Sequence, residues 1–236
     1  MKLSKEQINQ LYTFTRQHYV EWYDLQTELV DHLANDIESI WKKEPQLSFN
    51  QAKNKAFKKF GIFGFGDVIK DKSNAVSKHY RKLLWKIFKD FFKPPKVIIT
   101  LLITLIIFSL INLTAYHLTI LIIAFWIIFI IPIIFGLWYK LELNKRFKDT
   151  GKKWLIDEVI KQSGLLFIIS IQIPIQLLKY INPEDALKLN STELLVASFF
   201  LSIFIIFVYI LTKVIPPRLE KEMIQLYPEY KLLSKG

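Results

Sequence analysis

The side chains best suited to chemistry lie in one acidic segment near the N-terminus. Glu28, His32 and Asp36 recur every four residues, and Asp31 precedes the histidine. In a helix this spacing places Glu28, His32 and Asp36 on one face. Histidine and carboxylates at helical spacing can bind a metal ion, but three ligands from one helix leave a coordination shell incomplete. We therefore favour ion pairs within the protein, or a surface that contacts a partner, over a metal site.

The glycines at positions 61, 64 and 66 form a second motif, with a superficial likeness to a phosphate-binding loop. Such a loop needs a preceding strand and a following Lys-Ser or Lys-Thr pair, and the sequence predicts neither here. We expect the glycines to end a helix and turn the chain, with Phe63 and Phe65 packing beneath the turn.

Cysteine is absent from the 236 residues, which excludes disulfides, thiol catalysis and thiolate metal sites. The four histidines lie in different segments of the sequence. Because no catalytic set of residues emerges, we expect no catalytic residue, no cofactor and no enzymatic activity.

The elements that carry these residues follow from how charge is distributed along the chain. Hydrophobic residues make up 52% of the sequence, yet the formal net charge is +11. Residues 1–96 hold most of the charge, whereas long apolar stretches begin at Val97. This segregation is typical of a chain that meets water in one part and lipid in another. No base-reading motif accompanies the basic residues, so we expect no direct binding to nucleic acid.

Four apolar stretches have about the length that a helix needs to cross a bilayer, roughly 20 residues. They cover about 97–114, 118–139, 163–181 and 194–215. Lipid offers no hydrogen-bonding partners to a peptide backbone, so each stretch should be helical. The sequence therefore predicts an all-α, polytopic membrane protein with four transmembrane helices in residues 97–215 and a small helical domain before them.

The connections between these stretches differ in their basic residues. Seven Lys or Arg lie in 78–96 and seven in 140–161, whereas 114–117 holds none and 182–192 holds one. Because basic loops stay in the cytoplasm, both termini, including the tail 216–236, should be cytoplasmic. Aromatic residues at the predicted membrane boundaries, where such rings are favoured, include Trp138, Tyr139 and Trp154.

Gln172 and Gln176 flank Pro174 in the third predicted span. A proline frees a backbone carbonyl and kinks a helix, so this polar patch could be part of a transport path or a ligand contact. We favour hydrogen bonds to a neighbouring helix instead, because no charged residue lies deep in any span. A small transporter, or a transporter-associated subunit, is the alternative function.

Residues 1–75 are predicted to form a cytoplasmic helical domain. Apolar periodicity predicts helices over 4–20 and 22–43, and Ser48 followed by Gln51 is a capping box that opens a third helix. A unit this small buries little core. We therefore expect it to depend on a partner, a second copy of the chain or the membrane surface.

Residues 76–96 are predicted to be a basic amphipathic linker between this domain and the spans. Such a helix lies in the interface of an anionic leaflet, with its apolar side toward the lipid. The residues expected at the membrane surface are Lys78, Arg81, Lys82, Lys86 and Lys89.

A family resemblance is carried by two stretches, Tyr23–Glu38 and Ala52–Gly61. They resemble the helical, HAAS-like signalling domain of bacterial membrane proteins associated with PadR-type transcription regulators, over residues 1–75. The resemblance implies a cytoplasmic domain that contacts a regulator or its own membrane module, and it assigns no catalytic residue. We therefore predict a non-enzymatic, membrane-embedded signalling or regulatory protein. Its expected partners are anionic lipids and either a cytoplasmic regulator or a second copy.

Overall fold

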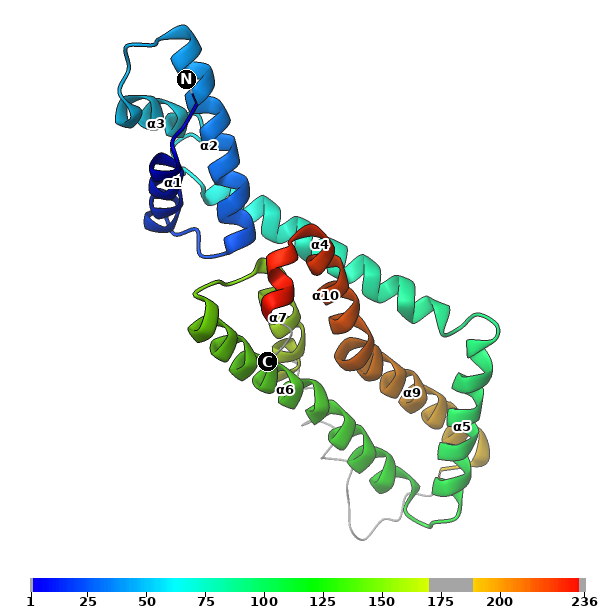
Figure 1. The fold of residues 1–236 in the computed structure, drawn as a ribbon. Coiled ribbons are helices and arrows are strands. Elements are labelled where there is room, and N and C mark those ends of the chain that lie inside the picture. Colours follow the sequence, from blue (N-terminus) through cyan, green and yellow to red (C-terminus); the bar gives the residue numbers. More distant parts are fainter. Residues whose placement is uncertain (1, 170–188, 234–236) are drawn as a thin grey trace. The chain divides into compact units, whose positions relative to one another are not determined.

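A computed structural model describes residues 2–169 and 189–233, and all regular secondary structure within them is helical (Figure 1). The all-α prediction is confirmed for this part of the chain. The chain divides into two compact units. The N-terminal unit comprises Met1–Lys78 and Lys145–Glu158, and the apolar unit comprises His79–Asn144 and Val159–Gly236.

Four helices build most of the N-terminal unit: α1 (Lys5–Gln17), α2 (Tyr23–Lys43), α3 (Phe49–Lys58) and the beginning of α4 (Gly66–Asp90). A capping box between Ser48 and Gln51 opens α3, as predicted. A second capping box, between Ser4 and Gln7, opens α1. The apolar stripes of these helices form one core, which includes Leu11, Val20, Leu25, Leu29, Leu33, Ile37, Ala52, Ala56 and Phe65.

The predicted glycine turn joins α3 to α4. Gly61 and Gly64 have φ angles of +76° and +53°, in the left-handed region that favours glycine. A Cβ atom at Gly64 would also lie only 2.9 Å from the Phe57 ring. Phe65 is buried, as predicted, but Phe63 is 76% exposed, so its predicted packing was wrong. The two left-handed glycines place Phe63 at the tip of the turn, away from the core.

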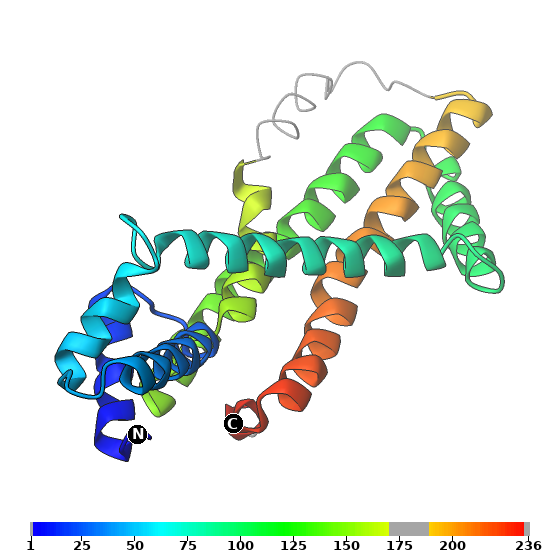
Figure 2. The ribbon, with the colours of Figure 1, turned by 90° about the horizontal axis from the view of Figure 1, so that it is seen from above.

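The helix α4 runs without interruption through the position where the sequence suggested a boundary between domain and linker (Figure 2). Its predicted basic side is exposed at all five positions, Lys78, Arg81, Lys82, Lys86 and Lys89. Tyr80, Leu84 and Ile87, on its apolar side, are buried. The Tyr80 hydroxyl donates a hydrogen bond to Ser163 Oγ at 2.8 Å within the apolar unit. Protein therefore covers the apolar side that was expected to face lipid.

The apolar unit contains α5 (Lys96–Asn112) and most of α6 (His117–Thr150) and α7 (Leu155–Ile169). After residues 170–188, which the structure does not describe, α9 (Ser191–Tyr209) continues through a π-helical turn (Ile210–Val214) into α10 (Ile215–Leu226). A 3₁₀ turn, Pro228–Leu233, follows.

Among the described residues, two helices are long and apolar enough to cross a membrane: α6 and the continuous stretch Ser191–Leu226. The first predicted span corresponds to α5, which is apolar but has only 17 residues, about 26 Å of helix. The third predicted span, 163–181, lies largely outside the described residues. Four transmembrane helices therefore remain a prediction, whereas two candidate spans are present.

A row of small hydroxyl residues packs α5 against α9. The Oγ1 atom of Thr104 lies 2.8 Å from Ser202 Oγ, and the same hydroxyl donates to the Thr100 carbonyl at 2.9 Å. Ser198, one turn before Ser202, is fully buried. Small residues four apart let two apolar helices approach closely where lipid gives no hydrophobic drive to associate. The sequence predicts polar contacts between apolar helices only at Gln172 and Gln176, and not at these hydroxyl residues.

Candidate functional site

Residues Lys145–Glu158 join the start of α2 through two backbone groups. The N-cap residue of α2, Trp22, makes no capping hydrogen bond with its side chain, so first-turn N–H groups need other acceptors. The Tyr23 N–H donates to the Lys153 carbonyl at 2.7 Å. Conversely, the Leu155 N–H at the start of α7 donates to Asp24 Oδ1 at 3.3 Å. The two segments thus satisfy open donors at the start of each other's helix.

The Trp154 side chain lies beside this backbone contact. It is 2% exposed, and its ring meets the Tyr23 ring edge-on at a centroid distance of 5.3 Å. Leu155 and Ile156 are buried as well. The sequence predicts Trp154 at a membrane boundary, and the structure shows that its ring is buried against α2. The connection between α6 and α7 is therefore part of a packed unit.

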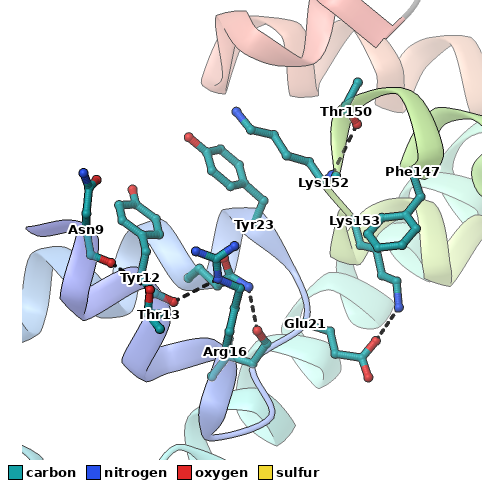
Figure 3. A pocket seen from close by; sticks show the side chains of 13 residues that line it. Asn9, Tyr12, Thr13, Arg16, Glu21, Tyr23, Phe147, Thr150, Lys152 and Lys153 are labelled. Carbon is teal, nitrogen blue, oxygen red and sulfur yellow. Dashed lines mark hydrogen bonds and ion pairs between the residues drawn. The ribbon is translucent and has the colours of Figure 1, made fainter.

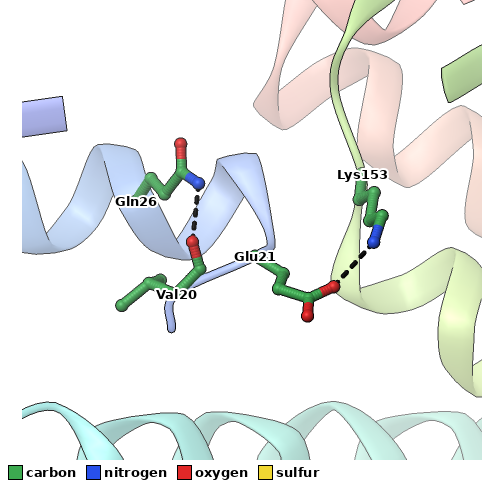
Figure 4. A network of polar contacts seen from close by, with 4 residues as sticks. All are labelled: Val20, Glu21, Gln26 and Lys153. Carbon is green, nitrogen blue, oxygen red and sulfur yellow. Dashed lines mark hydrogen bonds and ion pairs between the residues drawn. The ribbon is translucent and has the colours of Figure 1, made fainter. Parts of the chain in front are cut away.

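Two polar contacts hold the chain that leads into α2 (Figure 4). Gln26 Nε2 donates to the Val20 carbonyl at 2.7 Å, and the Gln26 side chain is buried. Lys153 Nζ lies 2.6 Å from Glu21 Oε2, at the surface. The buried amide fixes the backbone of the α1–α2 connection, whereas the exposed ion pair adds little stability.

Asp24 is the titratable group most affected by this contact. Burial raises the pKa of its carboxyl from 3.8 to about 6, although hydrogen bonds from the Leu155 and Leu25 N–H groups oppose the rise. The nearby carboxylate of Asp157 raises the pKa further. Because the folded chain holds this proton more tightly than the unfolded chain, Asp24 stabilises the fold most below about pH 4. That contribution is lost as the pH rises through about 6.

We expect Asp24→Asn to remove this pH dependence, because asparagine keeps the oxygen that accepts from Leu155 and loses the charge. Between pH 5 and pH 7.5 the unsubstituted chain should lose about tenfold in the hydrogen-exchange protection of residues 145–158, after correction for intrinsic exchange rates. The variant should lose almost none. Equal losses in both proteins would show that Asp24 does not control the contact.

A cavity of about 710 Å³ opens where α1 and the start of α2 meet residues 147–153, and we call it the seam pocket (Figure 3). All of its lining residues belong to the N-terminal unit. Tyr12 and Tyr23 stack with centroids 6.2 Å apart, and Lys152 Nζ lies 3.8 Å from the centre of the Tyr23 ring. Residues that line the pocket include Asn9, Tyr12, Thr13, Arg16, Tyr23 and Lys152.

The lining of the seam pocket combines charged and aromatic side chains. It includes three cationic side chains, Arg16, Lys152 and Lys153, and one carboxylate, Glu21. Cations beside aromatic rings provide a surface for an anion that carries an organic group.

The predicted acidic residues lie elsewhere in the same unit. Glu28, His32 and Asp36 share one face of α2, as their spacing predicts, and line a smaller cavity of about 290 Å³. Lys72 Nζ lies 2.6 Å from Glu28 Oε1, and Lys59 Nζ lies 2.6 Å from Asp36 Oδ1. The two carboxylates thus tie α2 to α4 and to the end of α3. This arrangement agrees with the ion-pair interpretation of the segment.

His32 and Asp31 remain at the surface of α2. The His32 side chain is 66% exposed, with Nε2 4.0 Å from Glu28 Oε1, and Asp31 is exposed. Among the described residues, no group of three or more His, Asp or Glu side chains is arranged to hold a metal ion. The candidate intramembrane residues, Gln172 and Gln176, lie outside the described residues.

The sequence does not predict the seam pocket, because its two sides are about 130 residues apart along the chain. Asp24 and Leu155, for example, are separated by 131 positions. Trp154 was the residue that could have indicated the contact between this loop and α2. A tryptophan ring is favoured in a buried contact as well as at a membrane boundary. The basic residues of the same loop were assigned to lipid.

Comparison with known proteins gives no relative to guide the interpretation of this site: no protein-family model, no curated protein and no solved structure matches the chain.

Proposed function

We propose that this chain is a non-enzymatic regulatory protein of a bacterial inner membrane, whose N-terminal unit binds a cytoplasmic protein and passes that event to the membrane helices. The observation that carries the proposal is the position of residues Lys145–Glu158 within the N-terminal unit. The same unit contains the last residues of α6 and the first residues of α7. A partner that shifts α2 would therefore pull directly on two helices of the apolar unit.

The proposed topology has four spans and cytoplasmic termini. The basic residues in 78–96 and 140–161, compared with one or none in the other two connections, support this orientation. It places the N-terminal unit and the α6–α7 connection on the same side of the membrane, and their membership of one compact unit supports that placement.

The exposed side of α2 is the proposed docking surface. Its carboxylates Glu28 and Asp36 are paired with Lys72 and Lys59, whereas Asp31 and His32 are exposed to a partner. The resemblance of residues 1–75 to a signalling domain associated with transcription regulators supports the same side of α2 and suggests a regulator, or a second copy, as the partner.

A photo-crosslinking amino acid at position 31 of the full chain, expressed at its native level, tests this proposal. We expect a discrete product with a cytoplasmic protein, because Asp31 is exposed on the proposed surface. The matched control is position 10, which is exposed on α1. If position 31 of a folded, membrane-inserted chain gives no protein product, or gives the same products as position 10, the docking proposal is wrong.

A further inference from the structure

The seam pocket has a cationic group on each of its two sides. Arg16 projects from α1 and is exposed, and its Nε donates to the Tyr12 carbonyl at 3.2 Å. Lys152 projects from the loop before α7 and reaches the face of the Tyr23 ring. An anion between Arg16 and Lys152 would contact both segments that form the seam (Figure 3).

The electrostatic field around the loop side of the pocket is strongly positive. Residues 145–153 include five Lys or Arg and one Asp. A concave site lined by one sign of charge raises the local concentration of the opposite ion. The pocket therefore favours an anionic ligand, although Glu21 neutralises Lys153 at its edge.

The guanidinium group and the tyrosine rings define the ligand more closely. Arginine presents a planar fork of donors that matches the oxygens of a phosphate, and lysine adds a point charge. The stacked rings of Tyr12 and Tyr23, inclined by 10°, offer aromatic surface to an organic group. Asn9 and Thr13 add polar atoms to the α1 side. The cavity also has the size of small-molecule sites in proteins, about 300–1,000 Å³.

We propose that the seam pocket binds a phosphate-bearing molecule, with the phosphate between Arg16 and Lys152 and the rest of the molecule against Tyr12 and Tyr23. The phosphate belongs either to a soluble compound or to a lipid headgroup. Binding tightens the contact between α1 and residues 147–153. A regulatory role for this binding rests on the proposed function, whereas the binding itself does not.

The cysteine-free chain allows a single reporter at the pocket. Thr13→Cys, at an exposed lining position, is labelled with a maleimide in the full chain held in phosphatidylcholine nanodiscs. One arm adds pyrophosphate, with sulfate at equal ionic strength as its salt control. The other arm replaces half of the lipid with phosphatidylglycerol. Gln46→Cys, exposed in the α2–α3 connection, is the control reporter.

We expect at least one arm to slow labelling at position 13 about fivefold or more, and to leave position 46 unchanged. Protection by pyrophosphate identifies a soluble ligand, and protection by phosphatidylglycerol identifies a headgroup. Arg16→Gln should abolish the protection, whereas Lys42→Gln, a neutralised exposed lysine at the end of α2, should keep it.

The proposal is overturned if neither arm protects position 13, if sulfate protects it equally, or if Arg16→Gln keeps the protection. Labelling at position 46 and the circular dichroism spectrum report whether each variant is folded. Because the assay contains no protein partner, its failure leaves the crosslinking test of α2 unaffected.

Discussion

Replacing Trp154 with alanine should release residues 145–158 from the N-terminal unit. The ring is 2% exposed and packs against Tyr23, and removing a buried tryptophan side chain costs about 3–5 kcal/mol. Hydrogen exchange of peptides from residues 145–158, measured on the full chain in detergent or nanodiscs, should therefore lose about a hundredfold or more in protection.

A second tryptophan provides the control for this experiment. Trp85 on α4 is 56% exposed, so Trp85→Ala should change the same protection by less than about threefold. Residues 145–158 that stay fully protected in Trp154→Ala would show that the tryptophan does not hold them.

Replacing Gly164 with valine should separate α7 from α6 within the apolar unit. A Cβ atom at Gly164 would lie 2.6 Å from the Pro132 carbonyl oxygen and 3.0 Å from the backbone of Gly136. Backbone atoms cannot move aside as a flexible side chain can, so the helices must shift. Overpacking of this kind costs about 1–3 kcal/mol, and a backbone clash belongs at the upper end.

The midpoint of thermal unfolding in detergent measures this effect, and it should fall by several degrees in Gly164→Val. Gly66→Ala is the matched control, because a Cβ there meets only the Phe63 Cβ at an ordinary 3.8 Å. A Gly164→Val protein as stable as the control would mean that α6 and α7 do not pack as closely as the structure has them.

Local sequence patterns predicted the helices well. The capping box at Ser48, the glycine turn after α3 and the apolar stripe of α2 depend on residues within a few positions of one another, and all three are present. The apolar stretches predicted the positions of α5, α6 and α9 for the same reason. Local spacing also placed Glu28, His32 and Asp36 on one face.

Contacts between distant segments could not be predicted in this way. The Lys153 carbonyl accepts from Tyr23, and nothing near either residue indicates the other. Basic residues and a tryptophan next to an apolar stretch are typical of a membrane boundary, so the sequence predicts Trp154 at such a boundary. The packing of Trp154 against α2 accompanies a hydrogen bond from the Tyr23 N–H, at the start of α2, to the Lys153 carbonyl. This pairing of distant residues is evident only in three dimensions.

The hydroxyl row between α5 and α9 illustrates a different limit. Threonine and serine are common in apolar helices, so the sequence alone does not single out Thr104 and Ser202 as contact residues. Only the packing of the two helices shows that these small residues face one another.

Residues 145–158 belong to the same compact unit as the N-terminal helices, and an engineered disulfide tests whether they fold together in the full chain. Trp22 and Lys153 form a parallel β-bridge, which brings their Cα atoms to about 5 Å, within the range a disulfide needs. The chain contains no other cysteine, so Trp22→Cys with Lys153→Cys can form only this bond within one molecule. A pair at positions 22 and 46, at opposite ends of the 21-residue α2, is the control.

Mild oxidation in native membranes should convert most of the 22–153 pair to a non-reducing mobility shift and leave the 22–46 pair reduced. If the 22–153 pair stays reduced while both cysteines react with a maleimide, residues 145–158 do not fold together with the N-terminal helices.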